Sequence, residues 1–213
     1  MNNVLRFLFF AVIVRIVVLI VLGLNVRHRH RLPTQGPAII VANHNSHLDT
    51  MVLMTLLPLR MLPHVQPVAA MDYFLRNRAL AWFAQHIIGI LPIKRQRDDP
   101  NEDLLAPCYN ALAQNKVLIF FPEGSRGEPE KLSALKTGIA RLASNDLEVP
   151  VIPVFLHGLG KALPKGEAML VPFFCDVFVG APLHWSGDKD QFMHELDGAM
   201  QGLADEAHVR PWE

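Results

Sequence analysis

The segment from Asn43 to Asp49 reads NHNSHLD and follows an apolar run directly. Ser46 and Asp49 have the S-x-x-D spacing of a capping box, in which both side chains satisfy backbone amides at the start of a helix. This capping role accounts for Ser46 and Asp49 without any catalytic function. It does not explain His44.

His44 and Asp49 have the residue types of a proton-transfer pair. On one helix, five steps of about 100° would leave them about 140° apart, so they meet only if His44 closes a strand and Asp49 lies in the first helical turn. The helix N-terminus favours the ionised carboxylate. That carboxylate accepts from one ring nitrogen of His44 and leaves the other free as a base. We therefore predict a His44–Asp49 dyad.

Two other kinds of site use the same residues. His44, His47 and Asp49 are possible metal ligands, but no second cluster completes a set. Ser46 is close enough to His44 to be a nucleophile, but the G-x-S-x-G elbow is absent and the capping role competes for its hydroxyl.

A second polar stretch, FFPEGSRG, runs from Phe120 to Gly127 after the apolar run KVLIFF. Pro122 ends strand pairing, and the residues after it form a turn. Arg126 carries a planar fork of donors suited to phosphate. If both stretches lie at one edge of a sheet, they place a base beside a phosphate-binding group.

The elements that would position these residues alternate along the chain. Apolar runs typical of short buried strands occupy residues 38–43, 67–71, 116–121, 149–156, 168–174 and 177–180. Helical spacing of apolar residues covers 46–57, 74–88, 101–114, 132–144 and a last stretch from about residue 188. This alternation predicts an α/β fold with a mixed, largely parallel sheet flanked by helices. Such sheets bind ligands at the carboxyl ends of their strands.

The N-terminal segment is unusually apolar. Residues 7–24 contain one charge, Arg15. At a helix centre Arg15 costs roughly 2.5–3.5 kcal/mol, which the surrounding Leu, Ile, Phe and Val residues outweigh at about 0.3–0.6 each. We expect a membrane span or an interfacial anchor, with a core helix as the alternative. The predicted organisation is a membrane-anchoring helix at 1–25 followed by one domain at 26–213.

The basic residues after this segment bear on location. Arg27, Arg29 and Arg31 follow the apolar stretch, and positive charge is enriched on the cytoplasmic side of membranes. They are also suited to anionic lipid. We therefore expect a membrane-associated protein on the cytoplasmic face of the inner (plasma) membrane.

Composition excludes several classes of protein. The formal net charge is zero, which argues against nucleic-acid binding. The two cysteines, Cys108 and Cys175, are too few for a disulfide framework or a four-thiolate metal site, and we expect inert thiols in a reducing compartment.

NHNSHLD resembles the N-H-x-S-x-x-D block of the glycerolipid acyltransferases, the 1-acyl-sn-glycerol-3-phosphate and related lysophospholipid acyltransferases. FPEGSR resembles their F-P-E-G-x-R block, and the segment from Gly89 to Arg95 falls where they carry G-x-x-F-I-D-R. The segment from Val151 to Val154 resembles their V-P-V segment. The resemblance covers about residues 37–185.

This resemblance implies direct acyl transfer. His44 would deprotonate the hydroxyl of a lysophospholipid, which attacks the thioester of acyl-CoA or acyl-carrier protein, while Asp49 holds the imidazole. Backbone amides near the start of the helix would be available to stabilise the oxyanion. Arg95 and Arg126 would hold the acceptor phosphate, and Glu123 and Gly124 would shape that pocket. Membrane lipid is an expected partner, and no metal or redox cofactor is implied.

The third block departs from the family pattern, with Pro92 and Lys94 in place of its Phe and acidic residue. Because this block is associated with the acceptor, the departure keeps two alternatives open. One is transfer to another lysolipid, such as a lyso-aminolipid. The other is a non-catalytic membrane- or carrier-binding module.

Overall fold

The computed structural model describes residues 3–18, 23–46, 48–74, 77–125, 127, 132–162 and 173–208. Within these residues a seven-stranded sheet has the order β1-β7-β6-β2-β5-β3-β4, in which β6 and β7 are antiparallel and all other pairs are parallel. The strands are β1 (Asn25–Arg27), β2 (Ala38–Ala42), β3 (Val65–Ala70), β4 (Leu91–Ile93), β5 (Val117–Phe120), β6 (Val151–His157) and β7 (Asp176–Val179). The mixed, largely parallel sheet predicted from the sequence is confirmed.

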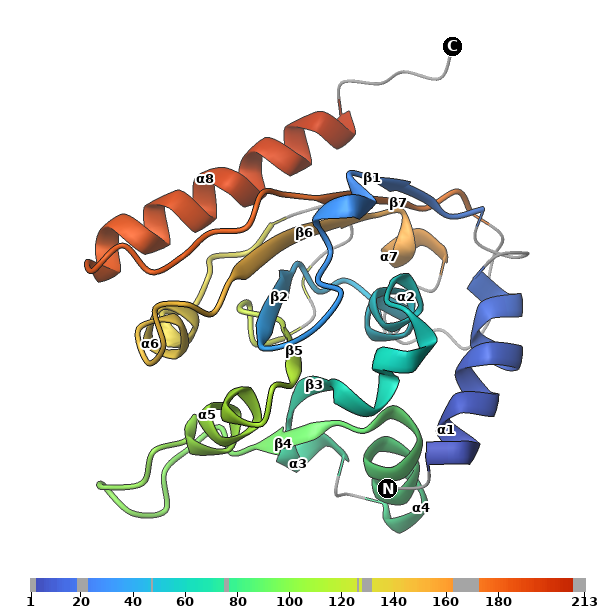
Figure 1. Ribbon diagram of the computed structural model, residues 1–213, viewed down its shortest axis with the longest axis horizontal. Helices are drawn as coiled ribbons and strands as arrows, with labels where there is room; N and C mark the ends of the chain where they lie inside the picture. The colour runs from blue at the N-terminus through green and yellow to red at the C-terminus, as the bar shows by residue number, and fades with distance from the viewer. Residues whose placement is uncertain are drawn as a thin grey trace.

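Helices cover both faces of this sheet (Figure 1). One face carries the N-terminal helix (α1, Asn3–Leu8, continued by η1, Phe9–Val14), α2 (Leu48–Leu56), η4 (Leu59–His64), η5 (Ala84–Ile88) and α7 (Leu159–Ala162). The other carries α5 (Ala106–Ala113), α6 (Gly138–Ala143) and α8 (Lys189–His208). Three short helices complete the described elements: η3 (Arg29–Arg31), α3 (Met71–Phe74) and α4 (Arg78–Phe83).

Strand β2 is central, and its residues alternate between the two faces. Ala38, Ile40 and Ala42 belong to the core on the α2 face, whereas Ile39 and Val41 belong to the core under α5, α6 and α8. All five are buried, as expected of a parallel strand covered on both sides. This burial fixes the register of β2 and therefore the position at which its last residue leaves the sheet.

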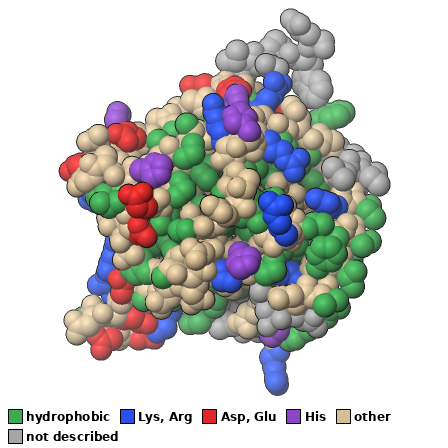
Figure 2. All heavy atoms as spheres, in the orientation of Figure 1, with side chains coloured by type: hydrophobic (Ala, Val, Ile, Leu, Met, Phe, Trp, Pro, Cys, Tyr) green, Lys and Arg blue, Asp and Glu red, His purple; other side chains and the backbone are tan. Residues whose placement is uncertain are grey.

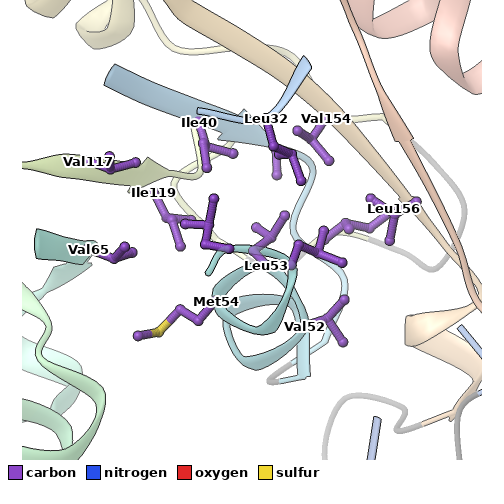
Figure 3. Close-up of a cluster of buried hydrophobic side chains, with 14 of the residues drawn as sticks. Leu32, Ile40, Val52, Leu53, Met54, Val65, Val117, Ile119, Val154 and Leu156 are labelled. Carbon is purple, nitrogen blue, oxygen red and sulfur yellow. The ribbon is translucent and has the colours of Figure 1, made fainter. Parts of the chain in front are cut away.

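Helix α2 is held rigidly in the core on its face of the sheet. Figure 3 shows its Val52, Leu53 and Met54 pointing among side chains from four neighbouring strands. Burying a side chain of this kind contributes about 1.5–3 kcal/mol relative to exposure. The start of α2, where Asp49 lies, is consequently a fixed platform.

The helix limits differ from those predicted in three places. The helix predicted at 74–88 is not a single helix: Phe74 ends α3, and α4 begins at Arg78, where Asn77 Oδ1 accepts from the amide of Ala79 (2.8 Å). The predicted helix at 132–144 begins only at Gly138, because the amide of Lys136 donates to the carbonyl of Pro122 (3.0 Å) and holds the preceding residues as a loop. The predicted helix at 101–114 begins at Ala106. Most of the predicted strand at 168–174 lies outside the described residues, and Phe173 and Phe174 are not in a strand.

The N-terminal helix packs one side against the domain. Phe10, Val14 and Val18 are buried in the core on the α2 face. Arg6 is also buried, and its guanidinium donates to the carbonyl of Val65 (2.8 Å). Within the described residues, no helix combines the length and apolar composition that a membrane span requires.

Candidate active site

The two polar stretches meet at the carboxyl edge of the sheet. Strands β2 and β5 are parallel neighbours, with Val41 opposite Phe120, so the residues after each strand emerge side by side. The amide of His44 donates to Glu123 Oε1 (3.3 Å), and the amide of Gly127 donates to the carbonyl of His44 (2.9 Å). The predicted placement of both stretches at one edge is confirmed.

The structure brings His44 and Asp49 together in the predicted geometry. His44 follows β2, Asp49 lies in the first turn of α2, and His44 Nδ1 is 2.9 Å from Asp49 Oδ2. Asp49 is 0% exposed, whereas the His44 side chain is 22% exposed. Because an ionised carboxylate only accepts hydrogen bonds, Nδ1 carries the proton. The free lone pair then lies on Nε2, and this tautomer suits a base.

The same aspartate also closes the capping box. Asp49 Oδ2 accepts from the amides of Asn45 (2.7 Å) and Ser46 (2.8 Å), and Ser46 Oγ accepts from the amide of Leu48 (3.3 Å). Asp49 therefore has both of the roles predicted for it, because the same carboxylate caps the helix and holds His44. Ser46 is fully buried in this cap.

This arrangement changes the expectation for the oxyanion. The amides of Asn45, Ser46, Leu48 and Asp49 all donate to acceptors within the turn, the last to the carbonyl of Ser46 (3.3 Å). Because these donors are engaged by the cap, the prediction that they are available to an oxyanion is wrong for these four.

Two positioning contacts were missed by sequence reasoning. The His44 ring stacks on Phe121, with centroids 4.2 Å apart and planes at 23°. The side chain of buried Asn43 donates through Nδ2 to the carbonyl of Leu156 (2.9 Å) and accepts through Oδ1 from the backbone amide of Leu156 (2.7 Å). The first contact orients the imidazole, and the second ties the end of β2 to β6. Their only sequence signals are a polar residue and an aromatic residue placed directly after two buried strands.

Glu123 and Gly124 lie in the turn that the second polar stretch forms after β5. Burial raises the pKa of Glu123 above its ordinary value, although the His44 amide and Ser133 favour the charged form. Gly124 has φ +74°, and a Cβ there would collide with Lys136 Nζ. Only glycine fits such a position without strain.

A cavity of about 1190 Å³ opens in front of His44. Part of its wall is apolar, including Met51, Ala69, Leu80, Phe83, Ile88 and Ile90. Its charged lining is cationic, namely Lys94, Arg95, Arg97, Lys136, Arg141 and Lys189. The volume exceeds the roughly 300–1,000 Å³ of ordinary small-molecule sites. Such a cavity fits a ligand with a long apolar part and an anionic group.

Comparison with known proteins agrees with this site. The family model described as Acyltransferase matches residues 23–157, which is more than half of the chain. The chain belongs to the acyltransferase family. It is 30% identical over 165 residues to a chloroplastic 1-acyl-sn-glycerol-3-phosphate acyltransferase of Arabidopsis thaliana, covering 76% of this chain and 44% of that protein. It is 27% identical over 169 residues to the human alpha enzyme of the same name, covering 76% and 56%.

A solved structure shares the fold of this family member. The crystal structure of the 1-acyl-sn-glycerophosphate acyltransferase PlsC from Thermotoga maritima has a TM-score of 0.76 at 18% identity, covering 99% of this chain and 81% of that one. The chain spans about half the length of the curated relatives it matches.

The basic side chains that line the cavity differ in whether a carboxylate pairs with them. Lys94 pairs with Asp98 (2.8 Å) and Glu102 (2.6 Å), and Arg95 lies 3.4 Å from Asp72. Arg141 and Lys189 also have carboxylate partners. Among the described residues, no carboxylate lies within ion-pair distance of Lys136, which sequence reasoning left without a role. Arg126 and His47 lie outside the described residues.

The alternative sites receive no further support. Within the described part of the chain, which excludes His47, no three His, Cys, Asp or Glu side chains gather as metal ligands. Cys108 and Cys175 are both buried free thiols, and burial raises the pKa of Cys108 to about 12.

Proposed function

We propose that this protein is an enzyme that transfers a fatty acyl group from a thioester donor, acyl-CoA or acyl-carrier protein, to the free hydroxyl of 1-acyl-sn-glycerol-3-phosphate, giving phosphatidic acid. One observation carries the proposal: His44, held by buried Asp49 at 2.9 Å, lines a large cavity that is partly apolar and partly cationic. The names of the relatives, all 1-acyl-sn-glycerol-3-phosphate acyltransferases, agree with it.

The proposed mechanism needs one base and no covalent enzyme intermediate. His44 Nε2 takes the proton of the acceptor hydroxyl as its oxygen attacks the thioester carbonyl. The C–S bond of the tetrahedral intermediate then breaks, and the imidazolium returns the proton to the departing thiolate. Asp49 stabilises that imidazolium and fixes the ring, as the aspartate of a serine-protease triad does.

Acceptor recognition falls to the cations of the cavity. We assign the acceptor phosphate to Arg126 and Arg95, with Lys136 as a third contact. Lys136 Nζ lies directly over Gly124, two residues before Arg126, and has no described carboxylate partner to displace. Arg95 lines the cavity as a half-exposed side chain, and its 3.4 Å contact with Asp72 is long. Glu123 supports this wall through the His44 amide.

Membrane lipid is the proposed source of the acceptor. The N-terminal helix buries one side and exposes an apolar side, made up of Val4, Leu5, Phe7, Leu8, Val12, Ile13 and Ile16. Such a two-sided helix suits the interface of a bilayer better than its centre. We retain the cytoplasmic face and the division at residue 25 as predictions. Arg29 and Arg31 also donate to the carbonyls of Leu56 and Val179, so these two arginines have structural roles besides any lipid contact.

A second acceptor remains a candidate for a specific reason. Lys94 stands where the family pattern that the sequence resembles has an acidic residue, and it is paired within its own loop. That loop borders the cavity, so it can favour a lysolipid with another headgroup, such as a lyso-aminolipid.

Steady-state transfer by purified protein tests the proposal. Lysophosphatidic acid, lysophosphatidylethanolamine and a lyso-aminolipid would each be offered with acyl-CoA and with acyl-carrier protein. We expect the highest kcat/KM with lysophosphatidic acid and loss of all transfer in His44→Ala. Transfer that survives His44→Ala refutes the base assignment, and preference for another acceptor replaces the phosphate assignment.

A further inference from the structure

Helix α4 (Arg78–Phe83) has an unusual surface. Its sequence is RALAWF, yet none of its residues is buried. Leu80 is 39% exposed and Trp82 is 50% exposed. Short helices depend on tertiary packing of an apolar face for their stability. An apolar six-residue helix with no buried residue therefore presents a contact surface that the domain itself does not cover.

This surface continues the exposed side of the N-terminal helix. The ring of Phe83 at the end of α4 packs edge-to-face on Phe9 of η1, with centroids 5.3 Å apart. In Figure 2 hydrophobic side chains gather at the edge of the molecule formed by α1, with Lys and Arg side chains beside them. We call the exposed apolar residues of the N-terminal segment given above, together with Trp82, the α1–α4 face.

The rim of the α1–α4 face has the chemistry of a bilayer interface. Arg78 begins α4 and is exposed, and exposed Arg60 shares a cavity of about 410 Å³ with Val4 and Phe7. The Trp82 ring stacks on His86, with centroids 5.4 Å apart. Tryptophan and arginine beside aliphatic side chains are typical of surfaces at the level of lipid headgroups.

The inner side of α4 belongs to the active-site cavity. Leu80 and Phe83 line the same cavity as His44. Helix α4 therefore stands between the cavity and the outer apolar surface. A lipid that leaves a bilayer at this point meets apolar side chains continuously from the outer surface to the cavity wall.

We propose that α4 enters the bilayer interface together with the N-terminal helix and forms the border over which the lysolipid passes from the bilayer into the cavity. This inference rests on the proposed function only in taking the acceptor to be a lipid. The contact of α4 with lipid is independent of catalysis and has its own test.

The kinetic test uses the variant Trp82→Ser, because Trp82 is exposed and is not among the residues that line the cavity. The control is Leu147→Ser, which changes a 58% exposed leucine in the turn after α6, on the other side of the molecule. We expect Trp82→Ser to lose about tenfold or more in transfer to lysophosphatidic acid held in vesicles of phosphatidylethanolamine and phosphatidylglycerol. Transfer to a short-chain lysophosphatidic acid dissolved as a monomer should stay within about twofold of the parent. The control should change neither rate.

Two kinetic results overturn the inference. An equal loss on vesicle-held and dissolved acceptor means that α4 shapes the cavity and does not contact the bilayer. An unchanged rate on vesicles means that α4 does not contribute to the contact between the protein and the bilayer. If the parent protein is a dimer that Trp82→Ser dissociates, the α1–α4 face is an interface with a second copy of the chain.

A fluorescence test separates this inference from the proposed function. Trp185→Phe and Trp212→Phe would leave Trp82 as the single tryptophan of the full chain. We expect its emission to fall in vesicles of acyl-chain-brominated lipid relative to matched unbrominated vesicles, whether or not any acceptor is turned over. Equal emission from vesicle-bound protein in the two lipids refutes the α4 contact. If quenching occurs and no lysolipid is acylated, the proposed function fails while the membrane contact of α4 stands.

Discussion

Replacing Asp49 by asparagine separates the two roles that the structure assigns to one carboxylate. Asp49 Oδ2 accepts from His44 Nδ1 and from the amides of Asn45 and Ser46. An asparagine of the same shape places either its oxygen or its NH₂ group at that position. With the oxygen there, the contacts persist but the charge that stabilises an imidazolium is gone. With the NH₂ group there, it faces two amide donors and forces the proton of His44 onto Nε2, where a base needs a lone pair.

The expected loss of rate follows from both orientations. The equivalent change in a serine protease lowers kcat by about 10⁴ through the wrong tautomer. We expect about 10³–10⁴ here, equivalent to about 4–5.5 kcal/mol of transition-state stabilisation. Folding stability should fall by only about 1–3 kcal/mol, because charge-assisted hydrogen bonds become neutral ones. The rate should therefore suffer far more than the fold.

Ser46→Ala is the matched control. It removes the hydroxyl that accepts from the amide of Leu48 and leaves the Asp49 carboxylate on His44. Loss of an N-cap of this kind costs about 0.5–2 kcal/mol of stability. We expect the control to unfold at lower temperature and to keep most of its turnover. Thiol release from acyl-CoA gives kcat, and thermal unfolding gives stability. If Asp49→Asn keeps kcat within tenfold of the parent, or if Ser46→Ala lowers kcat equally, the dyad interpretation is refuted.

Three further predictions concern the second polar stretch. Because the pKa of Glu123 is raised in the folded state, the fold loses stability as pH rises through that pKa. Glu123→Gln keeps an acceptor for the His44 amide and cannot ionise. It should therefore raise the Tm at neutral pH, and it should not raise the Tm at a pH below 4.5, the ordinary pKa of a glutamate. Gly124→Ala should lower stability by about 1–2 kcal/mol, because the backbone at this position is left-handed. It should also raise the KM for lysophosphatidic acid, because the added Cβ displaces Lys136. An unchanged KM would count against a phosphate role for that lysine. Arg126→Lys should lower kcat/KM for lysophosphatidic acid by about 1.5–3 kcal/mol, and Arg95→Ala should act in the same direction; equal losses on a neutral-headgroup lysolipid would contradict the phosphate assignment.

The dyad could be predicted because its causes are local. A buried run that ends at Ala42 and a capping box that starts at Ser46 leave only three residues between the strand and the cap. That short connection places His44 over the first turn of α2. The parallel pairing of β2 with β5 in the structure then brings in Glu123.

The contacts that sequence reasoning missed depend on pairings between distant segments. Asn43 bonds to Leu156 across a sequence separation of 113 residues, and no local pattern indicates which strand lies beside β2. Lys136 lies over Gly124 because its own amide is tied to Pro122, and that bond also delays the start of α6. Strands β1 and β4 have three residues each, too few for a periodicity to appear.

The altered family block acquires a structural reason from the same geometry. Strand β4, which contains Pro92, is an edge strand, and an edge tolerates a proline because it lacks a second neighbour for the missing amide. Lys94 pairs with Asp98 and Glu102, which raises its pKa and neutralises the new charge inside the loop that carries it. Pro92 and Lys94, the two departures from the family pattern, thus change the edge strand β4 and the loop after it, while Arg95 still lines the cavity. Glu102→Gln would leave Asp98 as the remaining carboxylate partner of Lys94. We therefore predict that it changes the ratio of kcat/KM between a lyso-aminolipid and lysophosphatidic acid, whereas an unchanged ratio would show that the pairing of Lys94 does not affect acceptor choice.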